Sequence, residues 1–182
     1  MSSTVGDYLF WRLSGIGVRN VIGRGPSSLF LGSIQRNHLN HIDSTRTSPS
    51  PSGNEVGAFV ASSAAGDLSA CYEEGRRLFA WRPVIIVSEL ESAQFTSVGN
   101  VTANLHFAAA IIINSPVTAA SQINRVLDVM LYESKPVFIG LSLAVAGQIM
   151  SLPQTVPSTS GGNASGQYAS CADAAVAMSF IR

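Results

Sequence analysis

The chain has 182 residues, of which 46% are hydrophobic and only 12% are charged. Its 11 basic residues balance its 11 acidic ones, and the absence of a basic stripe argues against nucleic-acid binding. No apolar run is long enough to span a membrane, and the first residues lack the pattern of a secretory signal. We therefore expect a cytoplasmic protein with one sizeable core, and so few charges favour a homodimer.

The part of the chain up to Asp43 predicts two helices and two strands in alternation. Apolar residues recur at helical spacing in the helices, and the strands are short runs between turn residues. In chain order these elements are a helix at Val5–Ile16, a strand at Val18–Ile22, a helix at Ser27–Gln35 and a strand at Asn37–Asp43. The next segment, STRTSPSPSG at residues 44–53, consists almost entirely of turn residues and predicts a mobile loop.

Residues 54–91 predict a strand, a helix and a second strand. Gly57–Ser62 and Pro83–Ser88 are short apolar runs of the kind found in buried strands. Between them, apolar residues recur at helical spacing. Asp67 is the expected N-cap, because its carboxylate can accept hydrogen bonds from the free amides of the first turn. Two strands joined by a helix form a βαβ unit, which predicts a parallel sheet.

The remaining chain continues the alternation. Ser92–Asn104 is polar and predicts an irregular connection with a break at Gly99. The segments that follow predict a strand at Ala109–Asn114, a helix with Ile123, Val126, Leu127, Met130 and Leu131 buried, and a strand at Lys135–Ser142. We assign residues 1–150 to one α/β domain and residues 151–182 to a linker and a short C-terminal helix. The whole pattern predicts an open, mostly parallel sheet with helices on both faces.

Such sheets bind ligands at the carboxyl ends of their strands, where the strand order reverses. The polar residues predicted at these ends are Arg24, Asp43, Ser62, Ser63, Glu89 and Asn114. His106 lies just before a predicted strand and is a further titratable candidate. We take the catalytic candidates to be Asp43, Ser62, Ser63, Glu89 and His106, although turn and capping roles explain many such residues equally well.

Weaker signals point to no cofactor and no metal. The GxG at residues 23–25 lacks the rest of a phosphate-binding motif. His38 and His41 lack a third ligand at a suitable spacing, although Asp43 is near, so surface histidines are the simpler interpretation. The two cysteines, Cys71 and Cys171, are expected to be free thiols.

Four separated segments carry a resemblance to a known family. They are VGDYLFWRLSGIGVRNVIG, AAGDLSACYEEG, RPVIIVSELESAQ and INRVLDVMLYESKPVFIGLSLAVA. In this order they resemble the N-terminal, pyrimidine-binding domain of thiamine-diphosphate-dependent 2-oxo acid decarboxylases, such as pyruvate and indolepyruvate decarboxylase. The tail SLPQ…CADAAVAMSFI looks like the linker and the start of the middle domain. The resemblance covers most of the chain and implies an open α/β fold whose copies pair face to face.

The chain departs from that family at its catalytic positions. The family has a glutamate after the second strand that contacts the aminopyrimidine ring, whereas this chain has Asp43, and residues 44–53 replace the helix that follows. The nearest other carboxylate is Glu55. The decarboxylases also carry paired histidines after the fourth strand, and His106 alone is a poor match. The motif for metal and diphosphate is absent from the sequence, so autonomous thiamine chemistry is not expected.

Three functions stay open. The first is a cofactor-independent enzyme in which the vacated groove orients a small hydrophobic substrate, as in a Diels–Alder cyclase of the norbornene synthase kind from natural-product biosynthesis. Orientation alone can lower a barrier by several kcal/mol, and about 7–11 kcal/mol at best. The second is the pyrimidine-binding subunit of a split thiamine-diphosphate decarboxylase. The third is a non-catalytic pseudoenzyme that regulates a decarboxylase.

Overall fold

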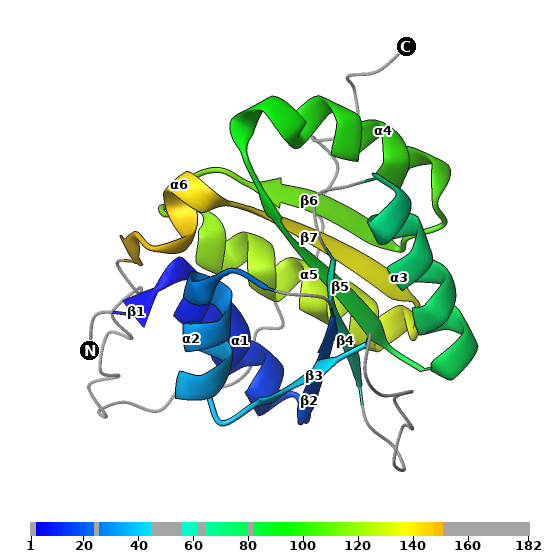
Figure 1. The fold of residues 1–182 in the computed structure, drawn as a ribbon, viewed down its shortest axis with the longest axis horizontal. Coiled ribbons are helices and arrows are strands. Elements are labelled where there is room, and N and C mark those ends of the chain that lie inside the picture. Colours follow the sequence, from blue (N-terminus) through cyan, green and yellow to red (C-terminus); the bar gives the residue numbers. More distant parts are fainter. Residues whose placement is uncertain (1–2, 24–25, 45–55, 62–64, 80–81, 151–182) are drawn as a thin grey trace, which may run out of the picture. The chain divides into compact units, whose positions relative to one another are not determined.

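The computed structural model describes residues 3–23, 26–44, 56–61, 65–79 and 82–150. Its main sheet has six strands in the order β3-β2-β4-β5-β7-β6, and all of its neighbouring strands are parallel (Figure 1). The strands are β2 (Asn20–Gly23), β3 (Asn40–Asp43), β4 (Gly57–Ala61), β5 (Val84–Leu90), β6 (Ala109–Ile113) and β7 (Pro136–Ser142). The predicted open parallel sheet is therefore confirmed.

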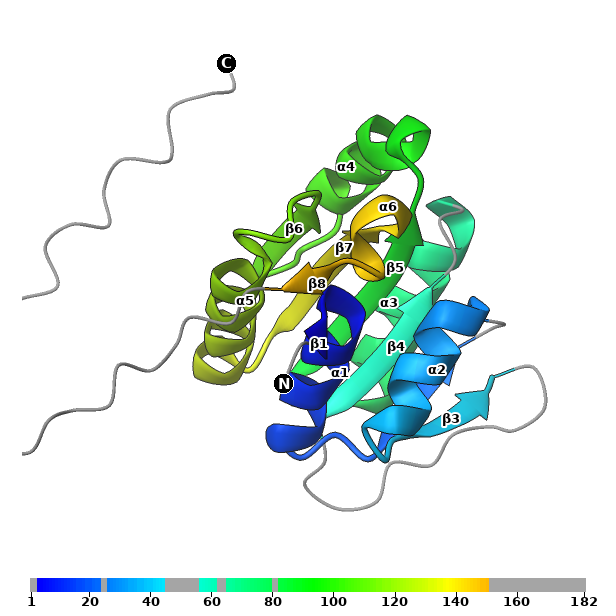
Figure 2. The same cartoon turned by 90° about the vertical axis from the view of Figure 1, so that its left-hand side faces the viewer.

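Helices cover both faces of this sheet (Figure 1). Among the described residues, the longer helices are α1 (Val5–Gly15), α2 (Ser28–Arg36), α3 (Ala65–Leu78), α4 (Phe95–Asn104) and α5 (Ala119–Glu133). The helices α1, α2 and α5 lie on one face, and α3 and α4 lie on the other. The short elements are the 3-10 turn η1 (Ser92–Gln94), α6 (Leu143–Ala146) and the antiparallel pair β1 (Ser3–Thr4) and β8 (Ile149–Met150), which lie side by side in Figure 2.

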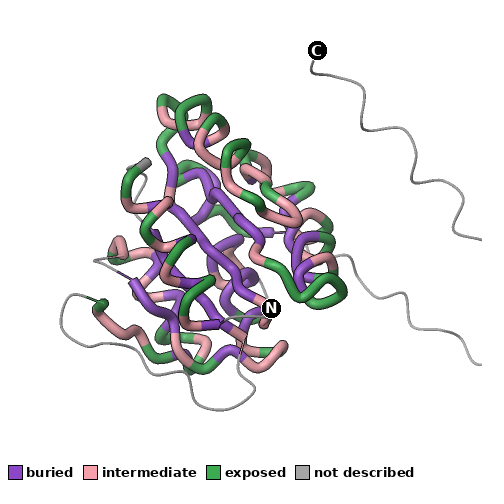
Figure 3. Tube along the Cα trace, turned by 90° about the vertical axis from the view of Figure 1, so that its right-hand side faces the viewer, coloured by how far each residue is buried: buried purple, intermediate pink, exposed green. Residues whose placement is uncertain are grey.

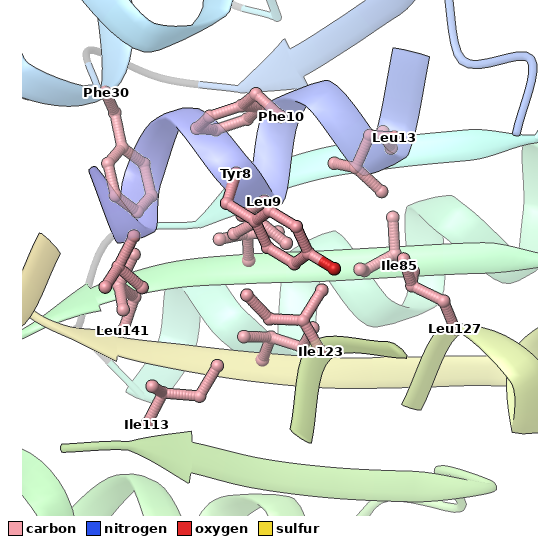
Figure 4. Close-up of a cluster of buried hydrophobic side chains, with 14 of the residues drawn as sticks. Tyr8, Leu9, Phe10, Leu13, Phe30, Ile85, Ile113, Ile123, Leu127 and Leu141 are labelled. Carbon is pink, nitrogen blue, oxygen red and sulfur yellow. The ribbon is translucent and has the colours of Figure 1, made fainter. Parts of the chain in front are cut away.

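Two apolar clusters fill the space between the sheet and its helices. The α1-side cluster, shown in Figure 4, includes Leu9, Phe10, Leu13, Phe30, Ile85, Ile123 and Leu127. The α3-side cluster includes Phe59, Leu68, Ile86, Leu90, Val98 and Phe138. Side chains along a strand alternate between the two clusters. Because the central strands are buried on both faces, they read as continuous apolar runs in the sequence, and they are mainly purple in Figure 3.

Local side-chain hydrogen bonds set where the first two helices begin. The Thr4 hydroxyl oxygen accepts a hydrogen bond from the Asp7 amide at 3.1 Å, at the start of α1. The Ser27 hydroxyl oxygen accepts one from the Phe30 amide at 3.3 Å, at the start of α2. These oxygens satisfy amides that have no partner within the helix, which is why hydroxyl residues are favoured there.

The end of α2 explains one of the two histidines that suggested a metal site. His38 follows the last helical residues and adopts a left-handed φ of 57°. Its amide donates to the Gln35 carbonyl, and the Leu39 amide donates to the Ile34 carbonyl, both at 3.1 Å. This pair of bonds is a Schellman motif, which terminates a helix. His38 is therefore placed by the helix end.

The structure corrects the prediction for residues 92–104. This segment forms η1 and the helix α4, and not an irregular connection. Phe95, Val98 and Val101 recur every three residues and pack on the α3-side cluster. Polar residues between them, together with β-branched valines and Gly99, hide this weak pattern in the sequence. Burial of the apolar stripe outweighs the low intrinsic helix propensity.

Two smaller predictions about helices are also wrong. The helix α3 begins at Ala65, so Asp67 lies in its first turn and is not the N-cap. On α5, the expected buried stripe is confirmed except for Leu131, which is 41% exposed. The predicted mobile loop lies almost wholly outside the described residues, as do Cys171, the linker and the C-terminal helix. Of the helices that are described, none has the length and hydropathy needed to cross a membrane.

Candidate functional site

The carboxyl ends of the six parallel strands lie along one edge of the sheet. The chain leaves β2 for β3 on one side and then returns to β4 on the other side of β2. The strand order thus reverses between β2 and β4, which is the place where open α/β sheets bind ligands. We call this region the carboxyl edge. The last residues of the strands at this edge are Gly23, Asp43, Ala61, Leu90, Ile113 and Ser142.

Glu89 is the best-defined acidic group at the carboxyl edge. It lies near the end of β5. Alternate side chains of a strand point to the same face of the sheet, and Ile85 and Val87 belong to the α1-side cluster, so Glu89 also points toward the α1 face. The Ser27 amide donates to Oε2 of Glu89 at 3.0 Å, and the Ser27 hydroxyl donates to Oε1. A half-buried carboxylate is therefore held in one orientation by a residue from the start of α2.

Ser27 has two structural roles at once. Its hydroxyl oxygen caps α2 through the Phe30 amide while the hydroxyl proton goes to Glu89. Our sequence interpretation placed Ser27 in the helix and did not select it as a site residue. The available signal was a serine directly after a Gly-Pro turn at the head of an apolar helix. The partner 62 residues away cannot be read from local sequence.

Asp43 lies at the same edge but not beside Glu89. It ends β3, the outermost strand, and is half-buried. Three strand spacings separate β3 from β5, which amounts to roughly 14 Å. Asp43 and Glu89 are therefore separate carboxylates, one on each side of the reversal point. Asn114, after β6, is exposed farther along the edge, and Ser62, Ser63 and Arg24 lie outside the described residues.

His106 lies at the opposite edge of the sheet from Glu89. It follows α4 and is exposed in the turn before β6. Two residues later, the Ala108 amide donates to the carbonyl of Pro136, the first residue of β7, at 2.8 Å. Because this contact joins the residue before β6 to the first residue of β7, His106 lies at the amino ends of these strands. The structure thus separates His106 from the predicted carboxyl-edge candidates by the length of the strands.

Ser88 is a buried polar residue that our sequence interpretation left inside a strand. It is 1% exposed and faces the α3-side cluster, and its hydroxyl has no hydrogen-bond partner among the described residues. An unsatisfied buried hydroxyl costs about 1–3 kcal/mol. Ser142, at the end of the neighbouring strand β7, is also buried. Two serines therefore interrupt an otherwise apolar surface just below the carboxyl edge.

Gly23 is explained by the packing of two strands. A side-chain carbon at this position would lie 2.2 Å from the carbonyl oxygen of Val60 on β4. No real contact is that short, so β2 and β4 can approach each other here only because residue 23 has no side chain. The first glycine of the GxG is thus required by the sheet itself. Within the described part of the chain, no group of three or more His, Cys, Asp or Glu residues could hold a metal ion.

Comparison with known proteins leaves the site to be interpreted from its geometry. No protein-family model matches the chain, and no curated protein matches it either.

Proposed function

We propose that the carboxyl edge binds a small, largely apolar substrate without a cofactor and that Glu89 is its main polar contact. The observation that carries this proposal is the half-buried Glu89 carboxylate, fixed by the Ser27 amide and hydroxyl beside the reversal point of the sheet. A fixed acceptor at a ligand-binding edge orients a substrate through one hydroxyl, amide or acidic C–H group. The apolar strand ends around it favour a hydrocarbon skeleton.

The reaction that suits such a site is a cyclisation or pericyclic rearrangement in natural-product biosynthesis. In this chemistry the carbon skeleton reacts with itself, and the protein contributes mainly orientation, worth up to about 7–11 kcal/mol. Support comes from the resemblance to a decarboxylase domain that lacks its family's catalytic glutamate. In this proposal the strand ends of a scaffold that has lost its cofactor contacts receive a substrate instead, and a Diels–Alder cyclase is one use of such a scaffold.

NMR titration of the isotope-labelled protein, followed through its amide signals, tests this proposal. The probes are apolar carbonyl fragments, with cyclohexenone and its hydroxylated analogue as the first pair. We expect amide shifts at Gly23, Ser27 and Leu90, and weaker binding of the hydroxylated probe to Glu89→Gln than to the wild type. Binding elsewhere, or equal affinity for the variant, would refute the role of Glu89. Ser28→Ala, at the neighbouring position that begins α2, is the matched control.

A second candidate is the pyrimidine-binding subunit of a split thiamine-diphosphate decarboxylase. It is favoured by one observation, namely the carboxylate of Asp43 at the carboxyl end of the second strand of the main sheet. Calorimetric titration with thiamine diphosphate and magnesium separates the two candidates. No binding agrees with the cofactor-free proposal. Binding that is lost in Asp43→Asn would replace it with the split-decarboxylase function.

The assembly and location of the protein stay predictions. A homodimer is expected from the resemblance and the low charge, and light scattering at micromolar concentration would reveal it. A cytoplasmic location is expected from the sequence and would be checked by fractionation.

A further inference from the structure

A second candidate site lies at the amino edge of the sheet, on the side away from Glu89. The first residues of β5 and β7, Val84 and Pro136, form part of a pocket of about 250 Å³. Phe79, just after α3, completes its apolar wall and is itself buried against Phe59 in an edge-to-face contact. The volume lies slightly below the range of about 300–1,000 Å³ for drug-sized ligands, so it suits a small molecule.

The polar part of this amino-edge pocket is basic. Arg76, Arg82 and Lys135 line it together with Ser134. Arg76 lies near the end of α3, Arg82 shortly before β5, and Lys135 directly before β7. Three cations around one small pocket are notable in a chain with only 12% charged residues and no net charge. Glu133, two residues before Lys135, forms an ion pair with it but is not one of the residues that line the pocket.

Two of these basic groups, Lys135 and Arg76, can bind an anion. The Lys135 ammonium lies 2.9 Å from a Glu133 carboxylate oxygen, and both side chains are more than one third exposed. Exposed pairs of this kind contribute only about 0.2–1 kcal/mol, so a bound anion can compete with Glu133. The Arg76 guanidinium carbon lies 5.7 Å from the centroid of the Tyr72 ring, which leaves its N–H groups able to donate.

Helix ends offer a simpler reason for cations here. The helix α3 ends at Leu78, and basic residues in a last turn offset the partial negative charge of the C-terminus. That role applies equally to Arg76 and Arg77, which are neighbours in this turn. Only Arg76 lines the pocket, whereas Arg77 pairs with Glu74 at 2.6 Å. The two arginines therefore separate a helix-end role from a binding role.

We infer that the amino-edge pocket binds a small phosphate monoester, with its phosphoryl group on Arg76 and Lys135 and its apolar part against Phe79, Val84 and Pro136. Arginine N–H groups match phosphate oxygens in geometry and charge. The inference is independent of the cofactor-free function proposed for the carboxyl edge, because no residue is shared between the two sites.

The test is calorimetric titration with phenyl phosphate, inorganic phosphate and benzyl alcohol at constant ionic strength. We expect phenyl phosphate to bind several-fold more tightly than inorganic phosphate, and benzyl alcohol not to bind. Arg76→Gln and Lys135→Gln should each lower the affinity for phenyl phosphate at least fivefold. The control Arg77→Gln should change this affinity less than twofold, and Glu89→Gln should leave it unchanged.

Several results would overturn the inference. They are the absence of phenyl phosphate binding, an equal loss of affinity in Arg77→Gln and Arg76→Gln, or a loss of affinity in Glu89→Gln. Thermal melts check that the variants fold, and if Arg76→Gln does not, Arg76→Lys replaces it. That variant keeps the charge but loses the planar donor pair, so an intermediate affinity is expected.

Discussion

The Ser27 amide donates a hydrogen bond of 3.0 Å to Glu89, 62 residues farther along the chain. This contact joins the start of α2 to the end of β5 across the ends of β2 and β4. Because Ser27 also caps α2, the helix end and the orientation of the carboxylate depend on the same side chain.

A double-mutant cycle with Ser27→Ala and Glu89→Gln measures this dependence. Ser27→Ala removes a cap and a donor and should cost about 1–2 kcal/mol in free energy of unfolding. Glu89→Gln replaces charge-assisted hydrogen bonds by neutral ones and should cost about 1 kcal/mol. We expect a coupling energy above about 0.5 kcal/mol from urea unfolding. Simple additivity of the two costs would contradict the hydrogen bonds described here, and Ser28→Ala should have little effect.

Gly23→Ala should be among the most destabilising single substitutions in this chain. Its new methyl group would lie 2.2 Å from the Val60 carbonyl oxygen, and because that neighbour is backbone, no flexible side chain can move aside. We expect a loss beyond the usual range of about 0.5–3 kcal/mol, measured by thermal and urea unfolding.

Gly15→Ala is the matched control for Gly23→Ala. No atom lies within 4 Å of the added carbon, and Gly15 is the last residue of α1. This substitution should be neutral or stabilising by up to about 0.5–1 kcal/mol. Equal losses of stability in Gly15→Ala and Gly23→Ala would show that the close approach of β2 and β4 does not cause the loss in Gly23→Ala.

His38→Gly should stabilise the protein. His38 holds a left-handed φ of 57°, which costs a residue with a side chain about 1 kcal/mol and costs glycine little. We expect a gain of up to about 1 kcal/mol in urea unfolding. The control is Gln35→Gly, at an exposed position inside the same helix, where glycine should instead destabilise by about 0.5–1 kcal/mol. A loss of stability in His38→Gly would indicate a role for the imidazole.

The Asp7–Arg36 ion pair predicts a pH-dependent part of stability. Partial burial acts to raise the pKa of Asp7, but hydrogen bonds from neighbouring side chains, Arg36 foremost, outweigh it and hold the pKa below its ordinary value of 3.8. A lowered pKa in the folded state contributes stability above the unfolded-state pKa, and this contribution is lost as pH falls through the folded-state pKa.

Arg36→Gln checks that prediction. Since the Arg36 side chain is 59% exposed, the solvent-screened cost at neutral pH should be only about 0.2–1 kcal/mol. The difference from the wild type should shrink as pH is lowered below the ordinary pKa of aspartate. Urea unfolding at several pH values gives the cost of the substitution at neutral pH and its change with pH. A stability difference between variant and wild type that is constant with pH would exclude the ion pair as its source.

The sequence was most informative where the side-chain pattern is strong. All six strands of the main sheet were predicted, and the signal is strongest in doubly buried strands such as β5, which begins with the apolar run Val84–Val87. The helix α4 was missed because its stripe, with Val98 at the centre, is thin. Glu89 could be selected as a residue at a strand end. Its partner Ser27 and the amino-edge pocket could not, because both depend on contacts between residues far apart in the chain.

The position of β7 between β5 and β6 has a consequence for how the sheet is completed. β6 precedes β7 along the chain, yet among the described strands β6 pairs with β7 alone. A nascent chain that has not yet supplied residues 136–142 therefore leaves one side of β5 open and β6 without a neighbour. Such late, non-local pairing slows folding and exposes unpaired strand edges to other chains. We expect refolding yield to fall steeply with protein concentration.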